Sequence, residues 1–258
     1  MHGLSLHYYT WSGGKSATDF TAQEYYDLLG KCREIEEVIE KHCAIMDKYD
    51  PEKHVALMLD EWGTWFAVEP GTNPGHLYQQ NTMRDAIVAS LTFDIFNRHT
   101  DRLKMANIAQ IVNVLQSMIL TNETGMVCTP TYHVFRMYNI HQDAEYIPTS
   151  VLCDTIDVSY NRKLPLVSAT ASKDSEGKTH ICLSNVDLEH DCQVSVTLSG
   201  IKAGTVTGEI LTAERINDHN TFEEPHLVEP ATFNGAKLKG NKLYVNLPAK
   251  AIVSLELE

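Results

Sequence analysis

The spacing of hydrophobic residues changes from segment to segment in the first half of the chain. Residues 4–10 (LSLHYYT) are β-rich, and residues 55–62 (VALMLDEW) stay apolar until their end, as in a strand buried on both faces of a parallel sheet. Between them, apolar residues recur at helical spacing from Thr21 to Pro51. Thr21 and Glu24 have the spacing of a capping box. This pattern predicts a strand, an amphipathic helix and a second strand.

The segments that follow continue the alternation of helix and strand. A polar loop leads to a second predicted helix around residues 77–98, in which apolar residues recur at intervals of four. Residues 102–115 (RLKMANIAQIVNVL) fit either a third strand or more helix, and periodicity does not decide between them. We expect a loop over residues 121–130 and a short helix near 131–138.

The pattern changes after residue 143. Short β-branched segments with alternating polarity, such as residues 179–187 (THICLSNVD) and 251–258 (AIVSLELE), are separated by turn signals. This pattern is typical of an antiparallel β-sandwich. The sequence therefore predicts two domains, an α/β domain over residues 1–143 and an all-β domain over residues 144–258.

Charge and composition exclude several classes of protein. The chain has 34 acidic and 21 basic residues, and its net charge of −13 repels phosphate backbones and anionic membranes. We therefore expect neither a nucleic-acid nor a membrane partner. No secretion signal or membrane span is visible. The six cysteines form no CxxC pair, which favours reduced thiols and a cytoplasmic location. Cys182 and Cys192 have a spacing that allows pairing across a hairpin, but a free thiol is the expectation.

Motifs for metals and cofactors are missing from the sequence. The 12 histidines form no HExxH motif and have no cysteine partners at zinc spacing. Residues 12–16 (SGGKS) lack the spacing of a phosphate-binding loop, and there is no GxSxG elbow. We expect no metal and no cofactor.

The ends of the two predicted strands carry the candidate chemistry, because strand ends in parallel α/β folds build the site. His7 and Tyr9 are two residues apart and so point the same way, next to the strand that ends in Asp60 and Glu61. A buried structural histidine, a packing tyrosine and a solvated or helix-capping carboxylate are the plain alternatives. Strand alternation turns Asp60 to the opposite face, which favours a structural role for it.

Two tryptophans follow the carboxylates. Trp62 and Trp65 lie within four residues of Glu61. Aromatic faces beside carboxylates are typical of sugar sites, since the rings pack against the C–H surfaces of a sugar. Either tryptophan fits the protein core equally well, and packing is the interpretation we favour for Trp62.

Several strings, in order, carry a family resemblance. They are SLHYYT, LDEWGTWF, RLKMANIAQIVNVLQSMI, TPTYHVFRMY, AERINDHNTFEEPHLVEP and LPAKAIVSLEL. Over essentially its whole length the chain closely resembles the C-terminal part of family 51 α-L-arabinofuranosidases. The resemblance implies a partial (β/α)₈ TIM barrel, about strands six to eight, followed by a jelly-roll β-sandwich. It makes residues 102–110 strand eight. It also implies retaining hydrolysis that releases terminal arabinofuranosyl groups from arabinan and arabinoxylan oligosaccharides.

The resemblance assigns roles residue by residue. Glu61, at the end of strand seven, corresponds to the catalytic nucleophile. His7 and Tyr9 match an HxY motif at the end of strand six that contacts the nucleophile and the sugar. Trp65 matches a tryptophan at the rim of the sugar pocket. Some members use a glutamine in the loop after strand eight. Residues 126–131 (MVCTPT) contain none, and Thr129 and Tyr132 are weak substitutes.

The other carboxyl group of the reaction is not found. A retaining glycosidase uses two carboxyl groups about 5–5.5 Å apart, and a full barrel takes about 250 residues, whereas only 143 precede the predicted sandwich. The family's acid/base glutamate ends strand four in an Asn-Glu pair. The sequence has only Asn122-Glu123, which follows strand eight. Strands one to five and the acid/base are therefore absent, and we expect the isolated chain to be inactive.

Three explanations of the short chain stay open, namely a truncated product, one half of a split enzyme and a piece of a longer protein. The expected partners are arabinose-containing oligosaccharides, together with a missing N-terminal half-barrel or further copies in a homo-oligomer. Two other functions also stay open. One is a non-catalytic carbohydrate-binding or scaffold module, and the other is a different retaining glycosidase of the same barrel clan, which the HYY and MANIAQIVN strings disfavour.

Overall fold

Three parallel strands form the first sheet of the computed structural model, which describes residues 1–258. They are β1 (Gly3–Trp11), β2 (Ala56–Trp65) and β3 (Leu103–Ile108), in the order β1-β2-β3. Both pairings are parallel, so the carboxyl ends of the strands meet at one edge. The segment that periodicity left ambiguous is a strand, as the family resemblance implied.

The first predicted helix is divided into two, α1 (Ala22–Cys32) and α2 (Glu34–Tyr49). Its predicted capping box is confirmed, because Thr21 and Glu24 bond to each other's backbone N–H groups. Only one residue separates the helices, and nearby the Tyr8 hydroxyl donates to the Lys31 carbonyl at 2.8 Å. The hydroxyl thereby satisfies a carbonyl in the last turn of α1, where the regular helical hydrogen bonds end.

The next helix begins later than predicted. The 3-10 helix η1 (Pro74–His76) precedes α3 (Met83–Arg98), where the Thr82 N–H donates to the Asp85 carboxylate at 2.8 Å and caps the helix. After β3, a two-stranded hairpin of β4 (Ile119–Thr121) and β5 (Met126–Cys128) replaces most of the loop predicted over residues 121–130. The short helix α4 (Pro130–Tyr138) is confirmed.

Antiparallel sheets form the second half of the chain. The larger sheet has the order β13-β12-β16-β10-β9-β6, the smaller has the order β11-β15-β14, and β7 and β8 form a separate hairpin. Their bounds are β6 (Glu145–Ile147), β7 (Thr155–Val158), β8 (Arg162–Pro165), β9 (Val167–Lys173), β10 (Thr179–Asn185), β11 (Cys192–Thr197), β12 (Val206–Leu211), β13 (Ala231–Thr232), β14 (Ala236–Lys239), β15 (Lys242–Leu247) and β16 (Ala251–Leu257), with 3-10 helices η2 (Asn139–His141) and η3 (Ser159–Asn161). A core of 12 buried apolar residues includes side chains from both sheets.

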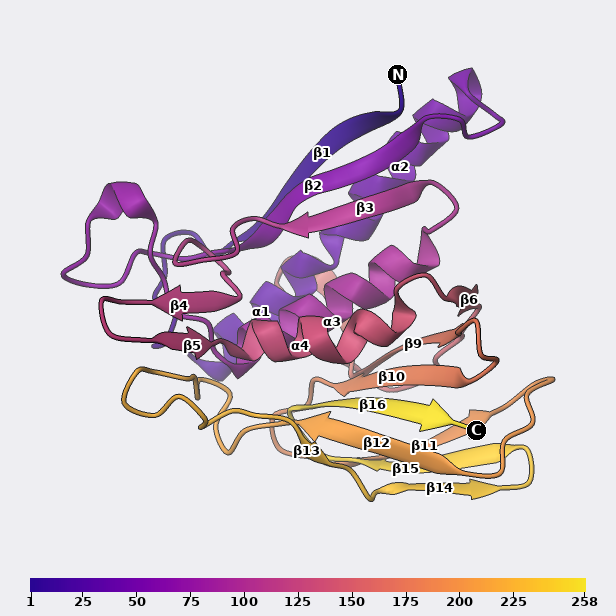
Figure 1. Cartoon of the computed structure of the whole chain (residues 1–258). Coiled ribbons are helices and arrows are strands. Elements are labelled where there is room, and N and C mark those ends of the chain that lie inside the picture. Colours follow the sequence, from indigo (N-terminus) through magenta and orange to yellow (C-terminus); the bar gives the residue numbers. More distant parts are fainter.

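The helices α3 and α4 lie between the parallel sheet and the six-stranded sheet (Figure 1). The main core, of 32 buried hydrophobic residues, extends from the α/β half into the antiparallel half, where Cys182, Leu211 and Ile252 join it. The predicted division at residues 143 and 144 stays a prediction. The two halves are packed against each other through a shared apolar core.

All six cysteines are free thiols, including Cys182 and Cys192. No helix is both long enough and apolar enough to cross a membrane.

Candidate active site

The pairing of β1 with β2 brings three of the predicted site residues together, although both strands continue for four residues beyond His7 and Glu61. His7 is paired with Glu61 in the strand register, and its Nδ1 lies 3.3 Å from Glu61 Oε2. The Tyr9 hydroxyl donates a hydrogen bond to the other oxygen, Glu61 Oε1. The two predicted partners therefore contact different oxygens of one carboxylate.

An irregularity between β1 and β2 changes the position of Asp60. Ser5 is paired with Met58 but His7 with Glu61, so β2 contains one extra residue between the two pairs. Such a bulge breaks the alternation of side chains along a strand. Asp60 Oδ1 accepts a hydrogen bond from the Ser5 hydroxyl at 2.8 Å and lies 3.2 Å from His7 Nε2. The expectation that Asp60 faces away from the site is therefore wrong, and the His7 ring bridges the two carboxylates.

The two tryptophans have different surroundings. Trp65 packs edge-on against Tyr9, with ring centroids 5.0 Å apart and an angle of 75° between the planes. Trp62 is only 1% exposed, and its ring lies against Phe93, Phe96 and Phe135. Trp65 therefore supports the tyrosine that contacts Glu61, whereas Trp62 belongs to the core.

A buried glutamine that the sequence reasoning missed holds the end of β2. The Gln116 side-chain oxygen accepts from the Thr64 N–H at 2.9 Å, and its amide donates to the Asp85 carbonyl at 2.8 Å and to the Thr131 hydroxyl at 3.2 Å. A Cβ on Gly63, which has φ +155°, would lie 3.4 Å from the Gln116 Cβ. The segment between β3 and β4 contains two glutamines, the exposed Gln110 and the buried Gln116, and precedes residues 126–131.

Thr129 and Tyr132, the weak substitutes for a family glutamine, lie at the start of α4. The Thr129 side chain caps α4 by accepting from the Tyr132 N–H, and its hydroxyl donates to the Ser117 carbonyl at 2.9 Å.

The Thr64 hydroxyl donates to Asp85 Oδ1 at 2.8 Å, which links the end of β2 to the first turn of α3. The site is thus positioned by buried polar contacts beneath β2.

The electrostatics of the site favour a proton on Tyr9. Burial, and then the hydrogen bond to Glu61, raise the pKa of Tyr9 well above its usual range. The tyrosine therefore remains a hydrogen-bond donor at neutral pH. The His7 side chain is 52% exposed and that of Glu61 is 35% exposed, so an external molecule can reach the carboxylate. A carboxylate that is accessible and held by two neighbouring side chains can act as a nucleophile or as a base.

A second group of possible metal ligands lies elsewhere. Ligand atoms of Glu36, Glu40 and His99 lie within 4.8 Å of one another. The Arg98 guanidinium already donates to Glu36 Oε1 at 2.9 Å and neutralises its charge. The arrangement is that of an ion pair with a neighbouring histidine.

Comparison with protein families identifies the class to which this fold and site belong. The family described as the alpha-L-arabinofuranosidase C-terminal domain matches residues 60–251. The chain therefore belongs to the family 51 α-L-arabinofuranosidases, a glycosidase family, and corresponds to their C-terminal region. This confirms the resemblance seen in the sequence.

Particular relatives agree. The chain is 58% identical over 262 residues to the intracellular exo-alpha-L-arabinofuranosidase of Bacteroides ovatus, with coverage of 100% of this chain and 51% of the relative. The solved GH51 arabinofuranosidase from Xanthomonas axonopodis pv. citri superimposes with a TM-score of 0.97 and 48% identity, covering 100% of this chain and 53% of that one. A family 51 enzyme from Bifidobacterium longum, at 22% identity and a TM-score of 0.86, shares the fold over 100% of this chain and 53% of that one.

The chain thus spans about half the length of the relatives it matches. Its α/β region with a parallel sheet, followed by antiparallel sheets, matches the C-terminal half of the family 51 structures.

Proposed function

We propose that the chain supplies the nucleophile half of a retaining α-L-arabinofuranosidase that releases terminal arabinofuranosyl residues from arabinan and arabinoxylan oligosaccharides. The observation that carries the proposal is the Glu61 carboxylate on β2, held by Tyr9 through one oxygen and adjacent to His7 through the other. On this proposal, β1, β2 and β3 are strands six to eight of a (β/α)₈ barrel. The antiparallel sheets form the jelly-roll domain, with the boundary at residues 143 and 144.

In the proposed reaction, the Glu61 carboxylate attacks the anomeric carbon of the arabinofuranosyl ring. The bond to the leaving oxygen breaks as a second carboxyl group protonates that oxygen, and water then hydrolyses the glycosyl ester. Tyr9 and His7 hold Glu61 in the orientation for attack, and Trp65 supports Tyr9 at the rim of the sugar pocket.

We assign the acid/base to the half of the relatives' length that this chain does not span. Glu123 is exposed and lies in the turn between β4 and β5, after the third parallel strand, so it is not our candidate. We further propose a cytoplasmic location, supported by the word intracellular in the name of the Bacteroides ovatus relative.

The test compares the isolated chain with a fusion that places the N-terminal half of the Bacteroides ovatus relative before it. We expect the fusion to hydrolyse a nitrophenyl arabinofuranoside and the isolated chain not to. Glu61→Gln should abolish the activity of the fusion, while Glu123→Gln, a matched control, should leave it unchanged.

Two results would contradict the proposal. A folded fusion that binds arabinan-derived oligosaccharides but hydrolyses nothing would favour the carbohydrate-binding module instead. Turnover by the isolated chain that Glu61→Gln removes would show that no second half is needed.

A further inference from the structure

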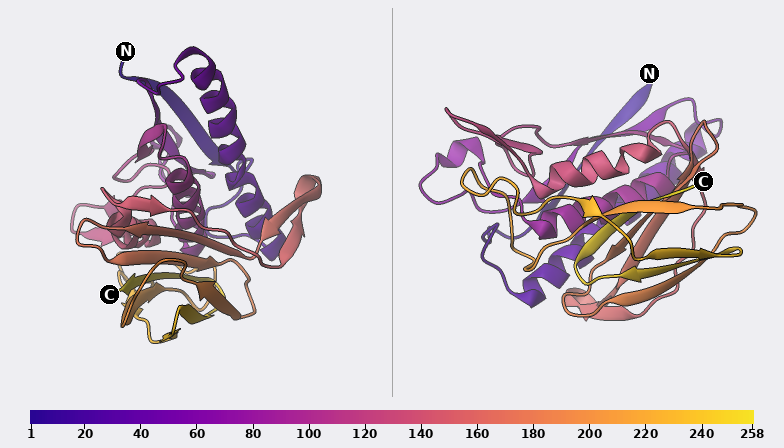
Figure 2. Two further views of the ribbon diagram at one scale, coloured as in Figure 1. Left: turned by 90° about the vertical axis from the view of Figure 1, so that its right-hand side faces the viewer. Right: turned by 60° about the horizontal axis from the view of Figure 1, so that its bottom comes forward.

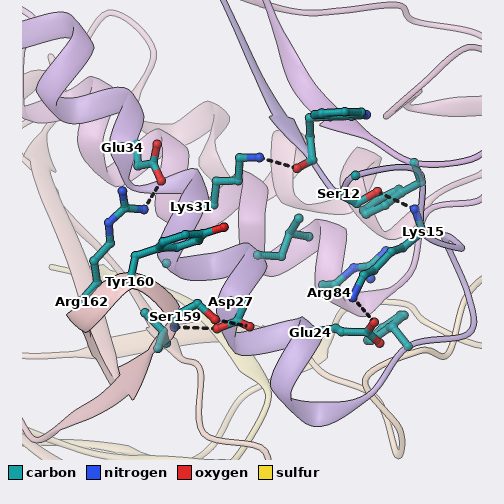
Figure 3. A pocket seen from close by; sticks show the side chains of 17 residues that line it. Ser12, Lys15, Glu24, Asp27, Lys31, Glu34, Arg84, Ser159, Tyr160 and Arg162 are labelled. Carbon is teal, nitrogen blue, oxygen red and sulfur yellow. Dashed lines mark hydrogen bonds and ion pairs between the residues drawn. The ribbon is translucent and has the colours of Figure 1, made fainter.

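A groove separate from the candidate active site runs between the loop after β1, helix α1 and the β7–β8 hairpin. Its cavity has a volume of about 540 Å³, which is within the range of small-molecule sites. Figure 3 shows its polar side chains, which come from α1, from the first residues of α2 and α3, and from both flanking segments. Neither Glu61 nor His7, Tyr9 or Trp65 lines it.

Tyr160 is at the turn of the hairpin and breaks a local rule of backbone conformation. Its φ is 65° and that of Asn161 is 56°, both in the left-handed region. Glycine, asparagine and aspartate are the residues that tolerate this region, and a bulky aromatic residue there is strained. The Tyr160 ring is nevertheless 89% exposed, so no burial offsets the strain. Strained residues of this kind are concentrated at functional sites.

Polar contacts on both sides of Tyr160 fix the hairpin against the helices. The Ser159 N–H and hydroxyl donate to the two Asp27 oxygens at 2.8 and 2.7 Å, and Arg162 forms an ion pair with Glu34. The Arg162 guanidinium also lies 5.7 Å from the centre of the Tyr160 ring. The left panel of Figure 2 shows the hairpin standing beside α1. Ser159 and Arg162, on either side of Tyr160, are therefore anchored to the helices.

A second exposed aromatic residue lines the groove at the end of β1. In this chain, which spans about half the length of its relatives, Trp11 is 56% exposed at the end of the edge strand β1. Its carbonyl accepts from Lys31 Nζ at 2.6 Å, and the same Nζ lies 5.7 Å from its ring centre. Trp11 is paired with Trp65 across the strands, and the Ser12 N–H donates to the Trp65 carbonyl at 3.0 Å. This wall of the groove is thus continuous with the rim of the candidate site.

The charges in the groove favour a neutral ligand. Four cationic side chains and three carboxylates line it, and the pairs Lys15–Glu24 and Arg162–Glu34 neutralise each other. Carboxylate and guanidinium groups bind hydroxyl groups, and aromatic rings pack against C–H surfaces. A neutral, hydroxyl-rich chain with apolar ring faces combines both requirements.

We propose that this groove is a second carbohydrate-binding site, with Trp11 and Tyr160 as its aromatic platforms, which holds a neutral oligosaccharide away from the scissile bond. The identity of the sugar, an arabinose-containing oligosaccharide, rests on the proposed function. The inference that the groove binds a ligand depends only on the residues that line it.

The test measures binding of arabinan-derived oligosaccharides to the chain by tryptophan fluorescence in a Trp65→Phe background, where Trp11 is the exposed reporter. Tyr160→Asn removes the ring but places a residue that tolerates the left-handed backbone, so the fold should be retained. We expect affinity to fall by about tenfold or more with the loss of stacking. Tyr49→Ala is the matched control, because Tyr49 is 77% exposed and also lies beside a lysine but is outside the groove.

Equal affinity in Tyr160→Asn and the parent chain would overturn the inference. So would the absence of binding together with a Tyr160-dependent change in oligomeric state by light scattering, which would make the groove a contact between copies. Binding that requires Tyr160 in a fusion unable to hydrolyse arabinofuranosides would contradict the proposed function alone. A fusion that hydrolyses arabinofuranosides but whose oligosaccharide binding does not depend on Tyr160 would contradict this inference and leave the proposed function standing.

Discussion

The Tyr9 hydroxyl donates a hydrogen bond to the Glu61 carboxylate from the neighbouring parallel strand. The two side chains meet because the strand register pairs His7 with Glu61 and leaves Tyr9 two positions further along. The Trp65 ring packs against Tyr9 from the other strand. The orientation of the Glu61 carboxylate therefore depends on how β1 and β2 are aligned.

Tyr9→Phe should lower kcat/KM of the fusion enzyme by about 10- to 100-fold, because a hydrogen bond to a charged group contributes about 1.5–3 kcal/mol. The matched control is Tyr8→Phe, since the Tyr8 hydroxyl donates to a backbone carbonyl on α1 and not to the site. The measurement is steady-state hydrolysis of a nitrophenyl arabinofuranoside. Equal losses in the two variants would show that Tyr9 has no particular role at Glu61.

Asp60→Asn should lower kcat by about tenfold, less than Glu61→Gln, because Asp60 contacts the His7 ring and, on the proposed function, Glu61 is the group that attacks the sugar. Ser5→Ala removes the other hydrogen bond to Asp60 and serves as the control, with little change expected. Steady-state kinetics of the three variants in the fusion enzyme would decide the matter. Full activity in Asp60→Asn would return Asp60 to a purely structural role.

Gln116→Ala should destabilise the chain by about 2–4 kcal/mol, because it leaves buried partners of three hydrogen bonds unpaired. The control is Gln110→Ala, since Gln110 lies in the same loop and is exposed, and a change within about 0.5 kcal/mol is expected there. Urea unfolding followed by circular dichroism gives both values. Similar stability of the two variants would contradict the anchoring role of Gln116.

Asp94 should make stability depend on pH. Burial raises the pKa of Asp94 from 3.8 to about 7, so the folded chain binds this proton more tightly than the unfolded chain. Its contribution is fully present below pH 3.8 and is lost as the pH rises to about 7, by up to about 4 kcal/mol at 1.36 kcal/mol per pKa unit.

The experiment measures the free energy of unfolding across this pH range for the parent chain and for Asp94→Asn, and follows the difference between them. A difference is needed because burial lowers the pKa of His141 to about 4, which gives a contribution of opposite sign in an overlapping range. The stability of the parent relative to Asp94→Asn should decline as the pH rises. Parallel curves for the two proteins would contradict the prediction.

Local patterns in the sequence predicted the elements whose causes are themselves local. The capping box at Thr21, the strand that contains Glu61 and the short helix after residue 130 all follow from spacing and residue type, although that strand continues to Trp65. The approach of His7 and Tyr9 to Glu61 was also predictable, because neighbouring parallel strands end at the same edge.

Features that depend on contacts distant in sequence were not predictable. The bulge that turns Asp60 toward His7 exists only in the pairing of two strands. The break between α1 and α2 coincides with a hydrogen bond from Tyr8, which is 23 residues from Lys31. In the sequence, Gln116 is a single polar residue in an apolar stretch. Its role depends on partners in β2, α3 and α4 that only the folded chain brings next to it.

Three hydrogen bonds connect one face of α3 to the six-stranded sheet, and they limit how freely the antiparallel half can be exchanged for another domain. Ser90, Asp94 and Asn97 bond to Ser184, Ser168 and Thr170 at 2.9, 2.5 and 3.2 Å. Because hydrogen bonds are directional, these three contacts fix the position of α3 along the sheet. In the first turn of the same helix, the Asp85 carboxylate accepts a hydrogen bond from Thr64, which lies on β2, the strand that carries Glu61. Exchange of the antiparallel half for another module would therefore remove the contacts that set the position of α3, and with them the alignment of the strand that carries Glu61.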